Sequence, residues 1–199
     1  MIADKTAVVI LAAGSSSRLG HAKQLVHFRG KMLLQHSIDA ASHFQFCSNT
    51  VVVGARAHEI LEHIELKLFS SVMNEDWEEG MASSIRLGLK HAIDEVKDLE
   101  HIIILLADQP FVNVQVIENL IAKHIESKSD ATFCEYNDVV GVPAIFSKTN
   151  FKALEQLTAD QGAKKLLKDQ NFKYNTVKFD QGTIDVDTAE DVLRLKQLE

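Results

Sequence analysis

The sequence predicts an α/β fold built on a mainly parallel sheet with a small antiparallel portion. Short apolar runs, long enough to form buried strands, alternate with amphipathic stretches whose apolar residues recur at helical spacing. Residues 131–146 differ, because two extended pieces surround a turn signal at Asn137-Asp138, which predicts an antiparallel insertion or edge. Since the chain has 199 residues, 46% of them hydrophobic, we expect one domain over residues 1–199.

The first half of the chain contains three predicted strands and three predicted helices. Residues 7–11 are apolar on both faces and are followed by Gly14, which is typical of a buried parallel strand. Residues 50–53 form the next strand, which ends at Gly54, and a third strand lies near residues 69–73. Apolar residues at three- and four-residue spacings predict helices over residues 33–41, 58–64 and 81–93.

The second half continues the alternation around the antiparallel piece. Residues 102–106 are the most strand-like run of the chain, and Pro110 ends this run. The other expected elements are a helix over residues 114–125, a helix over 162–167, a strand over 172–177 and a closing helix over 189–198.

Composition and charge exclude several classes of protein. The net charge of −7 argues against nucleic-acid binding, which needs a basic face. The longest apolar runs, residues 7–13 and 102–107, are far shorter than the roughly 18 residues needed to span a bilayer, so we expect no membrane partner. We expect a cytoplasmic protein in which Cys47 and Cys134 are reduced, with one disulfide as the alternative.

The loop after the first predicted strand, Gly14-Ser15-Ser16-Ser17-Arg18-Leu19-Gly20, is a candidate anion site. Its small residues let backbone N–H groups close around a phosphate, and Arg18 and Lys23 add positive charge. The loop does not fit the Walker, GxGxxG or GxSxG patterns. The alternative is an ordinary strand-to-helix connection rich in turn-forming residues.

Two acidic segments also follow predicted strands. Asp108, directly after the most buried strand, is well placed to hold Mg²⁺, and its alternative role is to cap the turn before Pro110. Asp185 and Asp187 share one face of an extended segment, so one of them is a candidate ligand. Asp187 also competes with Thr188 to cap the closing helix. We expect Glu190 and Asp191 to stabilise the first turn of that helix.

Six segments in order along the chain resemble the motifs of one enzyme family. Residues 11–23 match the pattern Leu-Ala-Ala-Gly-x-Ser-x-Arg-Met-Gly-x-x-Lys, with Leu19 in place of Met. The other matching segments are residues 74–85, 106–110, 141–143, 160–164 and 185–191. Together they resemble the molybdenum-cofactor nucleotidyltransferases, which are MobA-like NTP transferases, and the cytidylyltransferase branch in particular.

The resemblance implies a three-layer α/β/α, Rossmann-like nucleotidyltransferase fold. It implies that a nucleoside monophosphate, CMP from CTP, is transferred to molybdenum cofactor with release of pyrophosphate. Lys23, Arg18 and Asp108 are then catalytic, and Asp108 with Asp187, or less favourably Asp185, holds Mg²⁺, for which Mn²⁺ is a substitute. The implied nucleotide-binding residues are Leu11, Ala12, Ala13, Gly14, Ser15, Ser16, Ser17, Arg18, Lys23, Gly80, Ser83 and Ser84.

Individual roles follow from the same resemblance. Backbone amides of residues 13–17 would hold the β- and γ-phosphates, and Lys23 would stabilise charge at the α-phosphate. Ser83 and Ser84 would contact the base or ribose, with simple capping of a helix as their alternative.

The identity of the two substrates is a finer question. Leu-Ala-Ala-Gly, rather than Leu-Ala-Gly-Gly, favours CTP over GTP in the family comparison. The chain departs from the family at the positions of Val142, Ala159, Lys164 and Ala189, where His or Asn, Gly, Arg and Pro are frequent. Val142 and Lys164 lie where the acceptor, a molybdopterin-type compound, is expected.

Other interpretations remain open. The rival enzymes are a GTP-dependent guanylyltransferase and a nucleotidyltransferase for a sugar or isoprenoid phosphate. A rival of another class is a non-catalytic accessory module for a molybdoenzyme, and a molybdoenzyme is also a candidate partner of the active enzyme.

Overall fold

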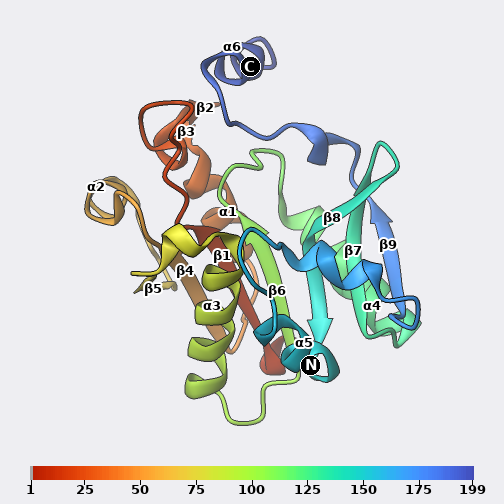
Figure 1. The fold of residues 1–199 in the computed structure, drawn as a ribbon. Coiled ribbons are helices and arrows are strands. Elements are labelled where there is room, and N and C mark those ends of the chain that lie inside the picture. Colours follow the sequence, from red (N-terminus) through yellow and green to blue (C-terminus); the bar gives the residue numbers. More distant parts are fainter. Residues whose placement is uncertain (1) are drawn as a thin grey trace.

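The computed structural model describes residues 2–199 around a twisted seven-stranded sheet in the order β5–β4–β1–β6–β8–β7–β9 (Figure 1). The strands are β1 Thr6–Ala12, β4 Ser48–Val53, β5 Ser70–Met73, β6 His101–Leu106, β7 Ala131–Tyr136, β8 Val139–Ser147 and β9 Tyr174–Lys178. Strand β8 runs antiparallel to β6 and β7, and every other pair in this sheet is parallel. The prediction of a mainly parallel sheet with a small antiparallel portion is confirmed.

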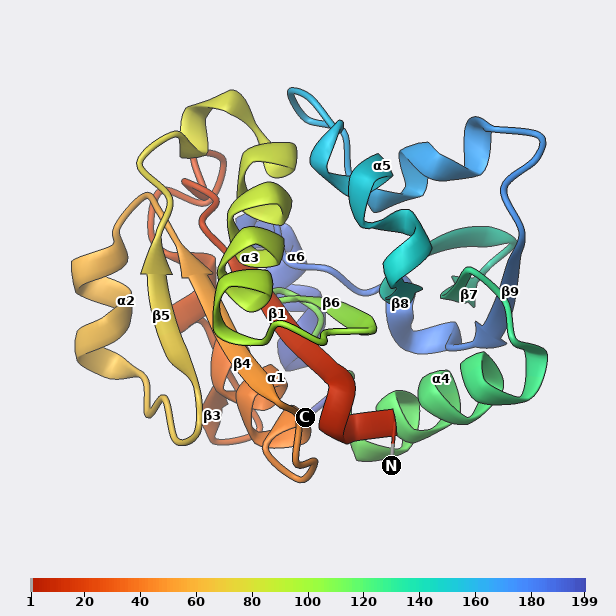
Figure 2. The same ribbon diagram turned by 90° about the horizontal axis from the view of Figure 1, so that it is seen from below.

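Helices cover both faces of the sheet, which gives three layers when the sheet is viewed along its edge (Figure 2). Helices α1 (Leu33–Ala41) and α4 (Val114–Ser127) lie on one face, and α3 (Met81–Glu95) and α5 (Phe151–Glu155) lie on the other. The remaining helices are α2 Ala57–His63 and α6 Ala189–Lys196, together with 3₁₀ turns η1 Ile2–Lys5, η2 Lys23–Leu25, η3 Trp77–Glu79, η4 Lys148–Asn150, η5 Ala163–Lys168 and η6 Asp180–Thr183.

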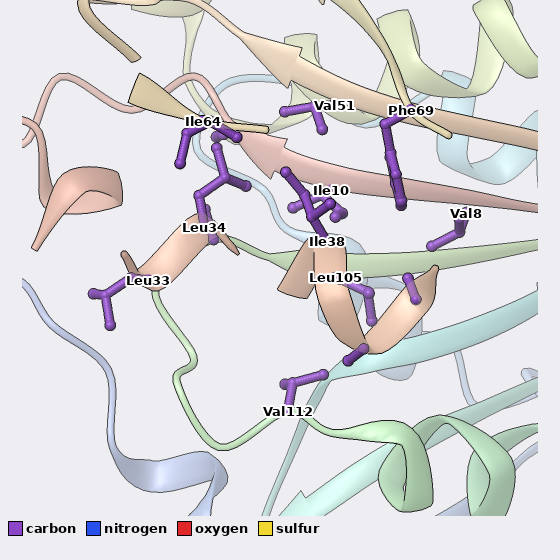
Figure 3. Packing of buried hydrophobic residues seen from close by; sticks show 14 of the residues in the cluster. Val8, Ile10, Leu33, Leu34, Ile38, Val51, Ile64, Phe69, Leu105 and Val112 are labelled. Carbon is purple, nitrogen blue, oxygen red and sulfur yellow. The ribbon is translucent and has the colours of Figure 1, made fainter. Parts of the chain in front are cut away.

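Alternate residues of β1 divide the interior into two hydrophobic clusters, because successive strand side chains point to opposite faces. Val8 and Ile10 pack with Ile38 of α1 in the cluster of Figure 3, whereas Val9 packs beneath α3. Burying each such side chain fully contributes about 1.5–3 kcal/mol. Gly88 lets α3 approach closely, since a Cβ at this position would lie 2.5 Å from Val9 Cγ1.

Several short elements were not predicted. A two-stranded antiparallel hairpin, β2 (His27–Phe28) with β3 (Lys31–Met32), precedes α1, and α5 follows β8. Residues expected to form a helix near 162–167 form the 3₁₀ turn η5 instead. The turn at Asn137 and Asp138 is present, and both residues have positive φ. Strand β8 lies inside the sheet, so the antiparallel piece is an insertion, and β9 forms the edge.

The order in which the strands are connected determines where a ligand can bind on this sheet. The chain moves from β1 to β4 and β5 on one side and then crosses to β6 on the other side of β1. The carboxyl ends of β1 and β6 therefore flank a topological switch point, where ligands bind in open α/β sheets.

Both cysteines are free, so the disulfide alternative is excluded. Within residues 2–199, no helix is long and apolar enough to cross a membrane.

Candidate functional site

A cavity of about 560 Å³ lies at the switch point between the carboxyl ends of β1 and β6. We call it the main cavity. Its lining residues come from four connections that are far apart in the sequence: Leu11, Ala12, Ala13, Gly14, Ser15, Ser17, Arg18, Lys23, Gln24, Trp77, Glu78, Gly80, Met81, Ser84, Leu106, Ala107, Asp108 and Asp160. Most of the predicted nucleotide-binding residues are therefore brought together around one cavity.

Two side chains fix the backbone of the loop after β1. Gln24 is only 1% exposed, and its Nε2 donates hydrogen bonds to the carbonyls of Ala12 (2.7 Å) and Gly14 (3.3 Å). Ser16 Oγ accepts the backbone N–H of Lys23 at 3.0 Å, and the positive φ of Ser16 lets its carbonyl accept from Leu19 N–H. The Ser16 side chain therefore holds the loop, whereas Ser15 and Ser17 line the cavity.

Two glycines allow neighbouring loops to pack closely against one another in the walls of the main cavity. A Cβ at Gly54 would lie 2.9 Å from Ala13 Cβ and 2.8 Å from Trp77 Cβ. Gly80 has a φ of +100°, and a Cβ there would lie 2.7 Å from the carbonyl carbon of Ala159. Any other residue at these positions would push the walls of the cavity apart.

Four charged side chains form a cluster at the edge of the main cavity, which we call the charge cluster. Lys23 Nζ lies 2.6 Å from Asp108 Oδ2 and 2.7 Å from Asp187 Oδ1. Arg18 Nη2 lies 2.6 Å from Asp187 Oδ2. The side chains of Lys23 and Asp108 are 18% and 13% exposed, so their charges are poorly screened by water.

The charge cluster shifts the ionisation of its members. Burial alone would lower the pKa of Lys23, but Asp108 and Asp187 more than offset it and raise the pKa above its usual value. Burial would raise the pKa of Asp187, but Lys23 and Arg18 lower it. The ammonium and the carboxylate therefore both remain ionised around neutral pH.

The donor set of Asp108 fits a divalent cation. Its Oδ1 is buried and has no hydrogen-bond partner among residues 2–199, while its Oδ2 binds Lys23. Carboxylate oxygens are the ligands that Mg²⁺ prefers. In the described part of the chain, no three His, Cys, Asp or Glu side chains converge into a metal site. A cation here would therefore take its remaining ligands from phosphate and water.

Asp185 and Asp187 are separated by the fold. Asp187 belongs to the charge cluster, whereas Asp185 lines a second cavity. Partial desolvation of the Asp185 carboxyl, followed by the negative charges of Asp108 and Asp187, raises its pKa. Thr188, rather than Asp187, caps α6, and its side chain and that of Asp191 form a reciprocal capping box. The expected structural role of Asp191 is therefore observed.

The two predicted serines at the start of α3 are held by a residue that the sequence did not single out. Asn74 is 3% exposed, and its Nδ2 donates to Ser83 Oγ (2.8 Å) and Ser84 Oγ (2.9 Å). Ser83 Oγ also donates to the Gly80 carbonyl at 2.8 Å, so it stabilises the first turn of the helix. Only Ser84 of the pair lines the main cavity.

A second cavity of about 320 Å³ adjoins the main cavity and shares Leu11, Met81, Leu106 and Asp160 with it. Apolar atoms form the larger part of its walls, which is typical of small-molecule sites. Val142 and Lys164 line it, as do Gln109, Tyr136, Thr183 and Asp185.

Gln109 is the most constrained polar residue of this second cavity. It is 3% exposed, and its Nε2 donates to the Val142 carbonyl at 3.1 Å. Its Oε1 is buried with no hydrogen-bond partner among residues 2–199. Asn74 and Gln109 lie within matching motif segments and Gln24 directly follows one, but the sequence assigned none of the three a role.

The chain is similar to known proteins over most of its length. The family model described as "MobA-like NTP transferase domain" matches residues 8–176. Purine catabolism protein PucB of Bacillus subtilis strain 168 is 31% identical over 194 residues, which cover 92% of each chain. Nicotine blue oxidoreductase of Paenarthrobacter nicotinovorans is 29% identical over 196 residues, which cover 94% of each chain.

Solved structures are similar along the whole chain. The crystal structure of Rv0371c from Mycobacterium tuberculosis H37Rv has a TM-score of 0.84 and 32% identity, over 99% of this chain and 100% of that chain. Rv0371c has also been solved in complex with manganese, and that structure has a TM-score of 0.80 and 28% identity over 97% of this chain and 98% of its own.

Proposed function

The chain belongs to the MobA-like NTP transferase family, and on that premise we propose that it transfers CMP from CTP to molybdenum cofactor. Family membership makes it a nucleotidyltransferase, but the name of one relative refers to an oxidoreductase. The proposal for this chain therefore rests on the residues of its own site. The observation that supports it most is the charge cluster beside the loop after β1, whose residues line the main cavity.

In the proposed reaction, a phosphate oxygen of the acceptor attacks the α-phosphorus of CTP. One new P–O bond forms, the bond between the α-phosphorus and its bridging oxygen breaks, and pyrophosphate leaves with the bonding electrons. The acceptor phosphate is already largely ionised near pH 7, so no general base is required. Because both reactants are anions, positioning and charge neutralisation supply most of the rate enhancement.

The main cavity would hold the nucleotide. Amides of the loop after β1 would bind the β- and γ-phosphates beside Arg18, and Lys23 would stabilise charge that develops at the α-phosphate. Ser84 is available for the base or ribose. Ala13 in the Leu-Ala-Ala-Gly segment supports CTP over GTP by the family comparison.

A divalent cation would be held by Asp108 and Asp187. The unpartnered Oδ1 of Asp108 supports this assignment, and Asp185 is the less favoured alternative because it lines the second cavity. Mg²⁺ is the proposed ion, and the manganese complex of Rv0371c supports Mn²⁺ as a substitute. When bound, the ion supplies positive charge to the phosphates during transfer.

The second cavity would hold the acceptor, a molybdopterin-type compound. It adjoins the main cavity, so an acceptor phosphate bound there can reach the nucleotide. Lys164 at its rim would attract an anionic acceptor, and Gln109 Oε1 would accept a hydrogen bond from an N–H or O–H group. A molybdoenzyme that receives the product is the proposed protein partner.

The test is turnover of CTP, GTP, ATP and UTP with Mg²⁺ or Mn²⁺ and molybdenum cofactor, followed by pyrophosphate release. We expect CTP with molybdenum cofactor to be the best pair. Asp108→Asn should lower the rate about a hundredfold or more while the melting temperature stays near that of the parent protein. The control is Asp138→Asn, in the exposed turn between β7 and β8.

The outcomes separate the rival functions. Preference for GTP would identify a guanylyltransferase, and turnover with only a sugar or isoprenoid phosphate would change the acceptor class. Tight nucleotide binding without pyrophosphate release would identify an accessory module. Near-normal turnover of Asp108→Asn would overturn the metal assignment.

A further inference from the structure

The charge cluster contains its own counter-ions. Asp108 and Asp187 contribute two negative charges, and Lys23 and Arg18 contribute two positive charges, so the cluster is electrically balanced before any ligand binds. One ammonium group, Lys23 Nζ, contacts an oxygen of each carboxylate, at 2.6 and 2.7 Å. The ammonium thus neutralises both of the carboxylates that would hold a divalent cation.

A divalent cation held by Asp108 and Asp187 would therefore compete with the Lys23 ammonium for the same two carboxylates. Lys23 and Asp108 are mostly buried, so repulsion between two cations at this position would be poorly screened. A metal ion that entered the balanced cluster would also leave the ammonium buried beside it without a carboxylate of its own, which is strongly unfavourable. The metal can bind well only after the ammonium has another partner.

The main cavity offers that partner. Lys23 and Arg18 both line it, on the side where the loop amides would hold phosphates. The backbone of Lys23 is anchored through its N–H to Ser16 Oγ, whereas its flexible four-carbon side chain can turn without moving the loop. A triphosphate carries enough negative charge to draw both cations away from the aspartates.

We propose that the Lys23 ammonium is a temporary counter-ion of the metal-binding carboxylates. It holds Asp108 and Asp187 together in the nucleotide-free protein, and it moves to the triphosphate when a nucleotide binds. Nucleotide then binds before the metal ion, and the metal ion would be held by the two carboxylates that the ammonium has left. The inference rests on the proposed function in one respect, namely that these carboxylates hold the metal. It adds the order of binding and a second role for Lys23.

The first test measures binding of Mn²⁺ alone, without nucleotide, from the electron paramagnetic resonance signal of the free ion. Lys23→Met should bind Mn²⁺ about tenfold or more tightly than the parent protein, because the Asp108 and Asp187 carboxylates have lost their shared ammonium partner. Lys31→Met is the matched control, since Lys31 forms an ion pair with Asp39 away from the cavity, and it should leave Mn²⁺ affinity unchanged. Adding Asp108→Asn to Lys23→Met should abolish the gain.

The second test measures nucleotide binding in EDTA by titration calorimetry. The parent protein should bind CTP without metal, and Lys23→Met should weaken that binding about tenfold or more. The same substitution thus has opposite effects on the two ligands, which a merely structural role of Lys23 would not produce. Lys23→Gln serves as the second variant if Lys23→Met melts at a markedly lower temperature.

Equal Mn²⁺ affinity of the parent protein and Lys23→Met would overturn the inference. Binding of CTP only in the presence of Mn²⁺ would overturn the proposed order. Failure of CTP, GTP, ATP and UTP to bind even with Mn²⁺ would instead overturn the proposed function, while the competition between Lys23 and Mn²⁺ would still be measured without nucleotide.

Discussion

Three buried amide side chains position the groups around the two cavities. Gln24 holds the loop after β1, Asn74 holds both serines at the start of α3, and Gln109 holds the Val142 carbonyl. An amide supplies both a donor and an acceptor, so one side chain can satisfy groups of an irregular loop that have no ladder or helix partner. These residues therefore fix loops and a helix start beside the two cavities without adding charge.

The substitution Gln109→Leu tests the acceptor cavity at the scale of one residue. We expect the KM for the acceptor to rise roughly three- to tenfold, because one hydrogen bond to the acceptor is lost. The KM for CTP should stay unchanged, since Gln109 does not line the main cavity. Steady-state kinetics with each substrate varied in turn measure both values.

Gln115→Leu is the control for this experiment, because Gln115 is an exposed amide on α4. A rise in the KM for CTP with an unchanged KM for the acceptor would show that Gln109 serves the nucleotide instead.

Helix α6 is the element that positions Asp187. Asp191 Oδ2 accepts the backbone N–H groups of Asp187 (3.2 Å) and Thr188 (2.9 Å), so the cap of the helix also orients Asp187 of the charge cluster. The far end of the chain is fixed by Arg29, whose backbone N–H donates to Glu199 Oε1 at 2.7 Å and whose Nη2 donates to the Leu198 carbonyl at 2.9 Å. Figure 1 shows that this helix lies apart from the sheet, next to β2 and β3.

Thr188→Ala is the prediction at the scale of the element. Loss of the cap should destabilise α6 by about 1 kcal/mol. We expect faster hydrogen exchange of the α6 amides and a lower kcat, because Asp187 loses its fixed orientation. Thr158→Ala, at an exposed loop position after α5, should change neither quantity. Faster exchange of α6 with an unchanged kcat would separate the helix cap from the chemistry.

At the scale of the whole molecule, the two ends of β6 have different roles. Its carboxyl end leads to Asp108, whereas its first residue, His101, contacts the buried His124 through Nδ1 and Nε2 at 3.2 Å. His124 Nδ1 is also 3.2 Å from Thr132 Oγ1, and Ser147 Oγ is 3.0 Å from His124 Nε2. This end of the sheet thus joins α4, β6, β7 and β8 through one buried imidazole.

Acid should destabilise the fold through His124. Burial and the neighbouring His101, opposed by Asp130, lower the pKa of His124 from 6.5 to about 4. Between these values the unfolded chain binds more protons than the folded protein. The free energy of unfolding should therefore fall as the pH decreases from about 6.5 to about 4, by at most about 3 kcal/mol. Urea denaturation at a series of pH values measures it.

The comparison variants for this prediction are His124→Gln, which cannot titrate, and His58→Gln, whose parent side chain is 90% exposed. His124→Gln should show a weaker dependence of unfolding free energy on pH, and His58→Gln should match the parent protein. Parallel curves for all three proteins would contradict the assignment to His124.

Local patterns in the sequence were enough to predict most of the fold. Apolar runs such as residues 7–11 and 102–106 and the i+4 repeat of α3 are properties of neighbouring residues, so they indicated strands and helices at nearly their observed positions. Elements as short as α5 and β2 were missed because they contain too few residues to show a period. The motif residues that line the main cavity were recognisable because the loop after β1 and Asp108 each follow a strand.

By itself, the sequence determined the alternation of strands and helices and the family to which the chain belongs. Only the tertiary structure decided that Lys23, which is 85 residues from Asp108 and 164 residues from Asp187, contacts both carboxylates. It also decided that Asp185 lines a different cavity from Asp187, and that Ser16 holds the loop. These arrangements depend on which strands pair and how the connections pack against one another, and such long-range contacts leave no periodic trace in the sequence.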